Sequence, residues 1–260
     1  LLKNYCKAYD PATAQSELGV VIRTKYSTPE PIRRASLYDS YKFVLDDLAE
    51  AEKRLDKEED AYSNEYITSA AAQALHARVA LYMQDWDTAI EYASILIDDK
   101  KNTFKLADAK TKYNADYTFF DYMWAYDLSY EIIWRIGFTE TSYGSPLGTV
   151  FLNFTKDLTY YYPDYVPATA ALNLYDAADL RYSGYFAGKE QGLTIGYTNG
   201  LDWPMLVKYY GNRNFTSKLI FHVSMPKPFR LAEQYLIRAE AYCRKNDFTK
   251  AGNDLTALRK

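Results

Sequence analysis

The chain has 260 residues, of which 48% are hydrophobic and 25% are charged, a composition typical of a globular protein rather than a disordered or membrane-spanning one. Lys and Arg together number 31 against 34 Asp and Glu, so the net charge of −3 offers nucleic acid no basic surface. Tyr is unusually frequent, with 27 residues against 12 Phe and 4 Trp. Because Tyr combines a flat apolar ring with a hydroxyl, clustered Tyr residues favour a contact surface.

The first strong helical pattern covers residues 36–56. Apolar side chains recur there at intervals of three and four, opposite a charged face. They are Leu37, Tyr41, Val44, Leu45, Leu48, Ala51 and Leu55. Ser36 followed three residues later by Asp39 resembles a capping box, so a helix is expected to begin after Ser36.

Residues 69–83 and 86–98 predict two further helices, joined by Gln84-Asp85. So short a connection predicts an antiparallel hairpin. Small residues at Ala77 and Ala89 would let the two backbones approach closely, and Trp86 is expected in the core.

The same pattern returns 162 residues later. Ile237, Ala239, Asp247, Phe248 and Ala251 match Leu75, Ala77, Asp85, Trp86 and Ala89. A helix, a short Asp-containing turn, an aromatic staple and a second helix are typical of a tetratricopeptide-type hairpin. In this copy Cys243 is expected on a buried helix face, as a small hydrophobe.

Residues 101–225 change character and are rich in Gly, Pro, Asn, Thr and Tyr. We expect mostly irregular loops here, with a short helix at 173–180 and a short strand or helix at 131–136. Long ordered loops are usually functional, so this segment is predicted to carry the ligand site.

Aromatic residues gather within this segment, above all in residues 117–130. Flat rings rimmed by polar groups suit the stacking of a sugar ring, at about 1 kcal/mol per stacked ring. The candidates for glycan stacking are Tyr122, Trp124, Tyr126, Tyr143, Tyr161 and Trp203. A core role is the alternative for each ring, and it is the favoured interpretation for Phe119 and Phe120.

The charged residues near the second hairpin are interpreted as structural. Arg230, Glu233, Arg238 and Glu240 predict an ion-pair lattice on one helix face, and Asp179 with Arg181 a pair that fixes a loop. His76 is expected to be hydrogen-bonded and partly buried.

No catalytic or metal motif is present in the sequence. The two His residues, His76 and His222, are too few for a multi-His metal cage, and neither H-E-x-x-H nor G-x-S-x-G occurs. Two distant Cys residues form no disulfide framework. We therefore predict no enzyme, no metal and no cofactor, although the many carboxylates leave a glycosidase pair open. The spacing of Asp116, Asp121 and Asp127 matches no calcium loop, and calcium binding stays undecided.

Four stretches together resemble the SusD/RagB family of Bacteroidetes outer-membrane nutrient-binding lipoproteins. They are residues 17–20 with 33–38 and 45–48, residues 71–82 with 85–86, residues 172–176 with 179–181, and residues 230–241 with 257–259. The last stretch is the most specific. The sequence does not begin like a signal peptide, and we expect it to cover about half of the family's usual length, without the anchor Cys, the first helical segment or the C-terminal tail.

The resemblance implies an all-α fold of tetratricopeptide-like hairpins with long irregular loops and little or no strand. It implies one SusD-like domain over 1–260, with the helical repeat in 33–100 and 226–260 and the ligand loops in 101–225. It also implies a non-catalytic, surface-exposed outer-membrane lipoprotein that captures oligosaccharides and hands them to a TonB-dependent, SusC-like transporter. The alternative is a tetratricopeptide-type scaffold that binds a protein.

Overall fold

The structure is a computed structural model that describes residues 1–26, 32–55, 60–154, 159–176, 178–196 and 202–259. Contacts between residues divide the chain into two units. The first contains Leu1–Leu106, Tyr130–Trp134 and Phe229–Lys260, and the second contains Ala107–Ser129 and Arg135–Pro228. Each unit is described by itself, and the assignment of residues 1–260 to one domain stays a prediction.

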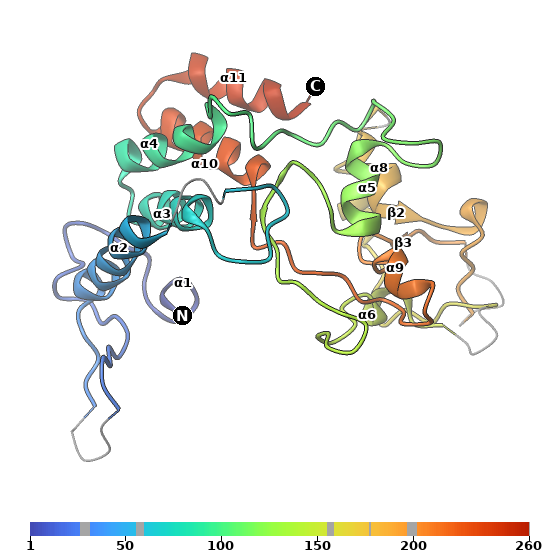
Figure 1. Ribbon diagram of the computed structural model, residues 1–260, viewed down its shortest axis with the longest axis horizontal. Coiled ribbons are helices and arrows are strands. Elements are labelled where there is room, and N and C mark those ends of the chain that lie inside the picture. The colour runs from blue at the N-terminus through green and yellow to red at the C-terminus, as the bar shows by residue number, and fades with distance from the viewer. Residues whose placement is uncertain (27–31, 56–59, 155–158, 177, 197–201, 260) are drawn as a thin grey trace. The chain divides into compact units, whose positions relative to one another are not determined.

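The regular secondary structure of the first unit is mainly helical (Figure 1). Its helices are α1 (Leu2–Tyr5), α2 (Leu37–Arg54), α3 (Ser69–Tyr82), α4 (Trp86–Ile97), α10 (Leu231–Arg244) and α11 (Phe248–Arg259). Two short antiparallel strands, β1 (Ile132–Trp134) and β4 (Phe229–Arg230), pair Ile132 with Arg230. Both predicted hairpins are present, and the mostly helical architecture confirms the predicted fold class.

Helix α2 begins and packs as the sequence predicts. The Ser36 hydroxyl accepts a hydrogen bond from the Asp39 amide at 2.9 Å and donates one to the Asp39 carboxylate at 2.7 Å. The apolar stripe buries Leu37, Tyr41 and Leu48 in a cluster that includes α3 residues. The capping side chain therefore fixes the start of the helix, and the stripe fixes which face packs.

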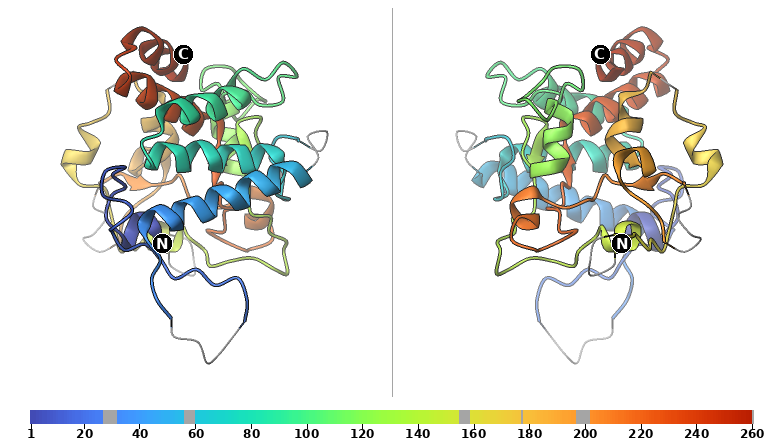
Figure 2. Two further views of the ribbon diagram at one scale, coloured as in Figure 1. Left: turned by 90° about the vertical axis from the view of Figure 1, so that its left-hand side faces the viewer. Right: turned by 90° about the vertical axis from the view of Figure 1, so that its right-hand side faces the viewer.

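The α3–α4 hairpin turns tightly at Gln84, whose φ is 60°. Asp85 caps α4 by accepting from the Thr88 amide at 3.2 Å and the Thr88 hydroxyl at 2.8 Å. Ala77 and Ala89 are fully buried in one cluster that also contains residues of α10. The small side chains let these helices approach closely, and in both views of Figure 2 the red C-terminal helices lie beside the green ones.

The second hairpin, α10–α11, departs from its predicted pattern at two residues. Phe248 was predicted as an aromatic staple but is 64% exposed, whereas its counterpart Trp86 is partly buried in the α3–α4–α10 cluster. The difference has a physical reason: α10 packs over α4, with Arg244 over the Trp86 ring at 5.8 Å, while Phe248 has no such cover. The prediction that Cys243 is buried is also wrong. The last buried residue of α10 is Ala241, and Cys243 lies two positions after it, outside the buried face.

The charged residues of α10 are structural: Glu240 pairs along the helix with Arg244 at 3.7 Å, as predicted, but Glu233 and Arg238 pair with other elements. Glu233 receives two bonds of 2.6 Å from Arg78 on α3. Arg238, which is 9% exposed, donates to the Asp254 carboxylate at 2.7 and 2.9 Å and to Asp98 at 2.8 Å. These charge-assisted bonds connect α10 to α3, α4 and α11.

His76 has the environment that the sequence predicts. Its Nδ1 lies 2.9 Å from Glu52 Oε1, and its ring stacks on Tyr92 with 3.7 Å between centroids. The side chain is 8% exposed. Burial together with the charge of Glu52 raises the pKa of the Tyr92 hydroxyl to about 12. Tyr92 is therefore protonated and uncharged at neutral pH.

The second unit consists of short elements connected by long loops. They are α5 (Phe119–Tyr126), α6 (Thr149–Leu152), α7 (Thr169–Leu172), α8 (Leu180–Tyr185), β2 (Phe186–Ala187), η2 (Lys189–Gln191), β3 (Met205–Leu206) and α9 (Arg213–Thr216). Strands β2 and β3 pair antiparallel, and Leu152, Leu193, Ile195 and Met205 form a buried cluster. The expected irregular loops are therefore ordered around a small core of their own.

In the segment 172–181 the predicted helix is wrong, and the predicted pair of Asp179 and Arg181 is confirmed. A helix over 173–180 is wrong, because α7 ends at Leu172 and α8 begins only at Leu180. Asp179 is the N-cap of α8, where its carboxylate accepts from the Arg181 amide at 3.0 Å and binds the Arg181 guanidinium at 2.5 to 3.1 Å. As an N-cap, Asp179 itself has an extended backbone, with φ −76° and ψ 104°, which separates the two short helices.

His222 gives the second unit a measurable sensitivity to acid. The residue is 4% exposed, and burial lowers its pKa below the ordinary value. Because the unfolded chain then binds a proton that the folded unit does not, the free energy of unfolding is expected to fall as pH drops below about 6.5, by at most about 1.4 kcal/mol per pH unit. Asn tolerates the φ of 62° at this position. His222→Asn should therefore flatten the slope between pH 7 and 5 in urea unfolding; an unchanged slope would contradict the assignment.

No helix in the described part of the chain is both long enough and apolar enough to cross a membrane.

Candidate functional site

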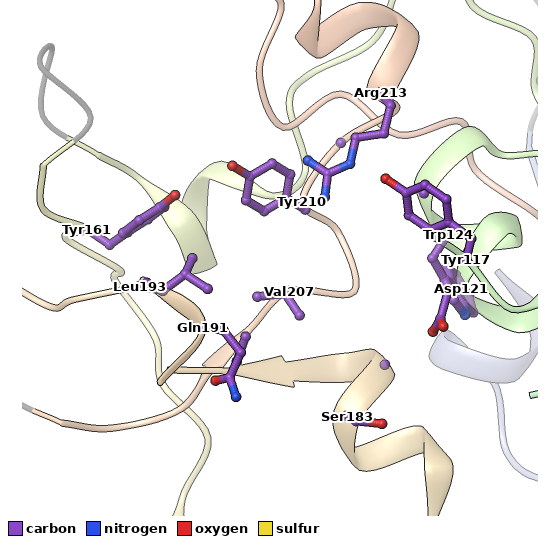
Figure 3. Close-up of a pocket in the computed structure, with 15 residues that line it drawn as sticks. Tyr117, Asp121, Trp124, Tyr161, Ser183, Gln191, Leu193, Val207, Tyr210 and Arg213 are labelled. Atoms are coloured by element: carbon purple, nitrogen blue, oxygen red, sulfur yellow. The ribbon is translucent and has the colours of Figure 1, made fainter. Parts of the chain in front are cut away.

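The second unit contains a cavity of about 450 Å³ (Figure 3). Its lining combines aromatic rings, polar groups and glycines. The lining residues are Tyr117, Asp121, Trp124, Ala125, Tyr161, Ser183, Gly184, Ala187, Gln191, Gly192, Leu193, Val207, Tyr210, Gly211 and Arg213. A volume in this range is typical of small-ligand sites.

Helix α5 provides one side of the cavity, and its start is fixed by a capping box. The Thr118 hydroxyl accepts from the Asp121 amide at 3.1 Å, and the Asp121 carboxylate accepts from the Thr118 hydroxyl at 2.7 Å. The lining residues Tyr117, Asp121 and Trp124 are spaced four and three positions apart, so their side chains lie on the same side of this segment. The capping box therefore sets which α5 side chains reach the cavity.

Tyr161, Tyr210 and Arg213 gather on the other side. Burial, followed by a hydrogen bond with Tyr210, raises the pKa of the Tyr161 hydroxyl, so it stays protonated at neutral pH. The Arg213 guanidinium lies over the Tyr210 ring, 4.3 Å from its centroid. In Figure 3 the Arg213 side chain extends from α9 between Tyr210 and the labelled residues of α5.

The α8–β2–η2 segment provides the third part of the lining. Gly184 packs so closely on the Phe120 ring that an added Cβ would lie 3.0 Å from it. Gly192 has a φ of 81°, a left-handed conformation that favours glycine. Between them, Gln191 uses its Oε1 to accept from the Gly188 amide at 2.8 Å. Two glycines and a side-chain cap thus bring Ser183 and Gln191 to the cavity.

Asp127 connects α5 to the segment before α9. Asp127 is fully buried, ends α5 with a φ of 55°, and pairs with Lys227. Its carboxylate accepts from Asn212 Nδ2 at 2.8 Å and from the Met225 amide at 3.0 Å. Asn212 Nδ2 also donates to the Tyr126 carbonyl at 2.9 Å. We call Asp127, Asn212 and Lys227 the buried anchor, because it holds two walls of the cavity in place.

Of the six predicted stacking residues, Trp124 and Tyr161 line the cavity. Much of the Trp124 ring is already in contact with protein, because the Lys208 and Lys227 ammonium groups lie 4.4 and 5.0 Å from its centroid and the Tyr185 ring meets it edge-on at 5.9 Å. Tyr161 and its partner Tyr210 therefore offer the better placed aromatic surface.

Tyr122 and Tyr126 lie beside the cavity rather than in its lining. Their rings stack with centroids 4.6 Å apart, and Tyr113 adds to the row at 4.0 Å from Tyr122. Tyr117 meets Tyr126 edge-on at 5.6 Å and connects this tyrosine row to the cavity.

Tyr143 and Trp203 lie away from the cavity lining. Tyr143 is 45% exposed and its closest ring partner is Phe215, at 6.5 Å. Trp203 packs against the buried cluster around Leu152, and its Nε1 donates to the Pro167 carbonyl at 2.9 Å. The structure thus brings two of the six residues into the cavity and a further two next to it, while a ligand role for any of them stays a prediction.

The candidate list from the sequence omitted several polar residues of the lining: Asp121, Ser183, Gln191 and Arg213. The strongest signal for Arg213 was its place directly after Tyr209-Tyr210-Gly211-Asn212, an aromatic pair followed by a turn. Gln191 likewise precedes a glycine in a polar stretch. Ser183 carries no such signal.

The three Asp residues considered for calcium are separated by their roles. Asp121 caps α5, Asp127 belongs to the buried anchor, and Asp116 is exposed. Among the described residues, no group of three His, Cys, Asp or Glu side chains is placed to hold a metal ion.

Comparison with known proteins gives matches among solved structures. No model of a known protein family matches the sequence, and none of the curated proteins matches it significantly. A SusD superfamily protein from Bacteroides thetaiotaomicron superposes on 98% of the chain with a TM-score of 0.72 and 22% identity. A SusD-like carbohydrate-binding protein from Bacteroides vulgatus also covers 98% of it, with a TM-score of 0.71 and 18% identity. Surface glycan-binding protein A from Bacteroides uniformis covers 92%, with a TM-score of 0.65 and 16% identity.

The chain spans about half the length of these structures, matching 55%, 50% and 53% of them in the same order. The match extends over nearly the whole chain, so it includes both the helical hairpins and the loop-rich segment between them. The chain therefore has the SusD-like fold, in agreement with the resemblance seen in its sequence.

Proposed function

We propose that this chain is part of a SusD/RagB-family protein that binds oligosaccharides at the cell surface without altering them. The observation that carries the proposal is the cavity lined by Tyr117, Tyr161 and Tyr210 together with polar side chains. Aromatic rings stack on the apolar faces of sugars, and the polar groups bind their hydroxyls. Two structural neighbours are described as carbohydrate- or glycan-binding proteins, which supports the same ligand class for this chain.

The proposal includes a location and a partner. As a SusD-like lipoprotein, the full protein would sit on the outer membrane through a lipid anchor and pass its ligand to a TonB-dependent, SusC-like transporter. Two to four stacked rings with a few exposed hydrogen bonds give millimolar to micromolar binding, about −4 to −8 kcal/mol. Weak and rapidly reversible binding suits a protein that captures a ligand and releases it to a transporter.

Calorimetric titration with a panel of plant, host and microbial oligosaccharides tests the proposal. Tyr161→Ala is expected to weaken binding of the best ligand about tenfold, because it removes one stacking ring and the hydroxyl bonded to Tyr210. Tyr143→Ala is the matched control, since this tyrosine lies outside the cavity lining, and it should leave the affinity within about twofold. Absence of binding across the panel would contradict the proposal, and so would release of reducing sugar from a bound glycan.

The alternative, a scaffold that binds a protein, is favoured by one observation on α10 and α11. Leu236, Phe248 and Leu255 are 52%, 64% and 42% exposed, so these two helices offer large apolar side chains to a partner. A specific protein partner whose binding is lost in Phe248→Ser and is unaffected by oligosaccharides would favour this alternative.

A further inference from the structure

The charge of the cavity lining comes from two residues with very different surroundings. Asp121 and Arg213 are the charged residues among those that line it. The Asp121 carboxylate is engaged at the start of α5, where it accepts from the Thr118 hydroxyl at 2.7 Å and from the Thr118 amide at 3.5 Å. Within the described part of the chain, by contrast, no carboxylate pairs with Arg213 and no carbonyl accepts from its guanidinium. The Asp121 carboxylate is thus committed to the capping box, whereas Arg213 is a charged group of the lining whose donors no described carboxylate or carbonyl accepts.

The Arg213 guanidinium is held in place by a ring rather than by an ion pair. Its central carbon lies over the Tyr210 ring, 4.3 Å from the ring centroid, and Tyr210 lines the cavity together with Tyr161. A stacked guanidinium keeps its N–H groups in the plane of the fork, where two parallel hydrogen bonds to a planar oxyanion can form. Because the side chain is only partly buried, these donors can be reached from the cavity.

A second cation, Lys208, lies among the aromatic rings next to Trp124. The Lys208 ammonium lies 4.4 Å from the Trp124 ring centroid, 4.7 Å from that of Tyr185 and 5.4 Å from that of Tyr209. The net charge of the whole chain is −3, so the Arg213 guanidinium is a local cationic group in a chain that is acidic overall. It favours an anionic ligand over a neutral one.

We propose that the cavity recognises an acidic oligosaccharide, with the carboxylate of a uronic acid residue bound by Arg213 and the sugar ring against Tyr161 and Tyr210. The inference rests on the glycan-binding function proposed above. It extends that function from sugars in general to a chemical class. A planar carboxylate matches the guanidinium fork in a way that a neutral hydroxyl cannot.

Calorimetric titration with matched ligand pairs tests this inference. The acidic probes are tetrasaccharides of galacturonate, of alginate uronates and of glucuronoxylan, and each is compared with its carboxyl-reduced form. The wild-type protein is expected to bind at least one acidic probe ten or more times more tightly than its reduced form. Raising the salt from 50 to 500 mM should narrow that gap, since salt screens charge.

Two substitutions at position 213 identify the group responsible. Arg213→Gln is expected to weaken binding of the acidic probe tenfold or more and to change binding of the reduced probe less than threefold. Arg213→Lys keeps the charge but not the fork, so it should recover only part of the loss. Lys218→Gln removes a positive charge from an exposed residue nearby that does not line the cavity, and it should behave as wild type. Unchanged thermal unfolding of the variants shows that they fold.

Each other result has a definite meaning. Equal losses for acidic and reduced probes in Arg213→Gln would overturn the inference while leaving glycan binding intact. Binding of neutral glycans alone, or tighter binding of a sulfated tetrasaccharide than of any uronate, would also overturn it. Failure of every glycan, neutral and acidic, would overturn the proposed function itself.

Discussion

Asp127→Asn is expected to lower the free energy of unfolding of the second unit by about 3 kcal/mol or more. The substitution removes the negative charge from a side chain that is fully buried, and it leaves the Lys227 ammonium, only 5% exposed, without its counterion. Asn adopts the left-handed backbone found at this position with little strain, so the effect reports the charge rather than the backbone. Urea unfolding followed by tryptophan fluorescence and circular dichroism measures it.

The same substitution is expected to weaken ligand binding. The Asp127 carboxylate holds Asn212, which in turn binds the Tyr126 carbonyl, so the buried anchor connects α5 to the residues directly before Arg213. Loosening it should move the two walls of the cavity relative to each other. Asp116→Asn, on an exposed residue of the loop before α5, is the control and should change stability by about 0.5 kcal/mol or less. Similar behaviour of the two variants would contradict the role assigned to Asp127.

Arg238→Met is expected to destabilise the first unit by about 3 kcal/mol or more. Arg238 joins three helices through Asp254, Asp98 and the Ser94 hydroxyl. The Asp254 side chain is only 7% exposed, and the substitution leaves its carboxylate buried without a counterion. Methionine retains most of the apolar volume, so the loss reflects the missing charge and hydrogen bonds rather than a cavity.

Arg244→Met provides a matched control on the same helix. Arg244 pairs with Glu240 across exposed positions at 3.7 Å, and an exposed ion pair of this kind contributes about 1 kcal/mol or less. Both variants replace an arginine of α10 by methionine. The difference between their urea midpoints therefore measures how much more the buried Arg238 network stabilises the protein than the exposed Arg244 pair. Midpoints that agree would show that the Arg238 network contributes little to stability.

The helices of the first unit could be predicted because their signals are local. Ser36 and Asp85 cap helices with hydrogen bonds that span three residues, and the spacing of apolar side chains defines which face packs. Which element covers a helix face, by contrast, depends on residues far away in the sequence. Trp86 and Phe248 occupy equivalent positions in the repeat, yet one is covered by α10 and the other is exposed.

The partners of buried charges were also beyond local reasoning. Glu233 and Arg238 lie near each other on one helix, which suggested pairing along it, but their counterions Arg78 and Asp98 come from residues well over a hundred positions away. A spacing rule compares positions within a few turns of helix. It cannot compare such a neighbour with a residue that is distant in the sequence but offers better geometry.

For the candidate site, composition indicated that residues 101–225 carry it, but not how the lining residues are arranged around the cavity. Tyr-rich stretches identified Trp124 and Tyr161, because density of aromatic residues can be read directly from the sequence. The contact of Tyr161 with Tyr210, and the position of Arg213 over that ring, depend on how ordered loops without periodic patterns fold. Glycines such as Gly184 and Gly192 shape the lining, but their role follows from close approach and backbone angle, which composition does not reveal.

The discontinuity of the first unit has a consequence for biosynthesis. When α3 and α4 have left the ribosome, the helix that covers Ala77 and Ala89 has yet to be translated, since α10 begins only at Leu231. The nascent hairpin must wait with an apolar face uncovered while residues 107–228 are made. The helical layer therefore cannot close before α10 has been translated, and its closure is slow because its contacts span much of the sequence. Premature release or a stalled chain would leave a species prone to aggregation, for which a chaperone that holds exposed helices would be the natural remedy.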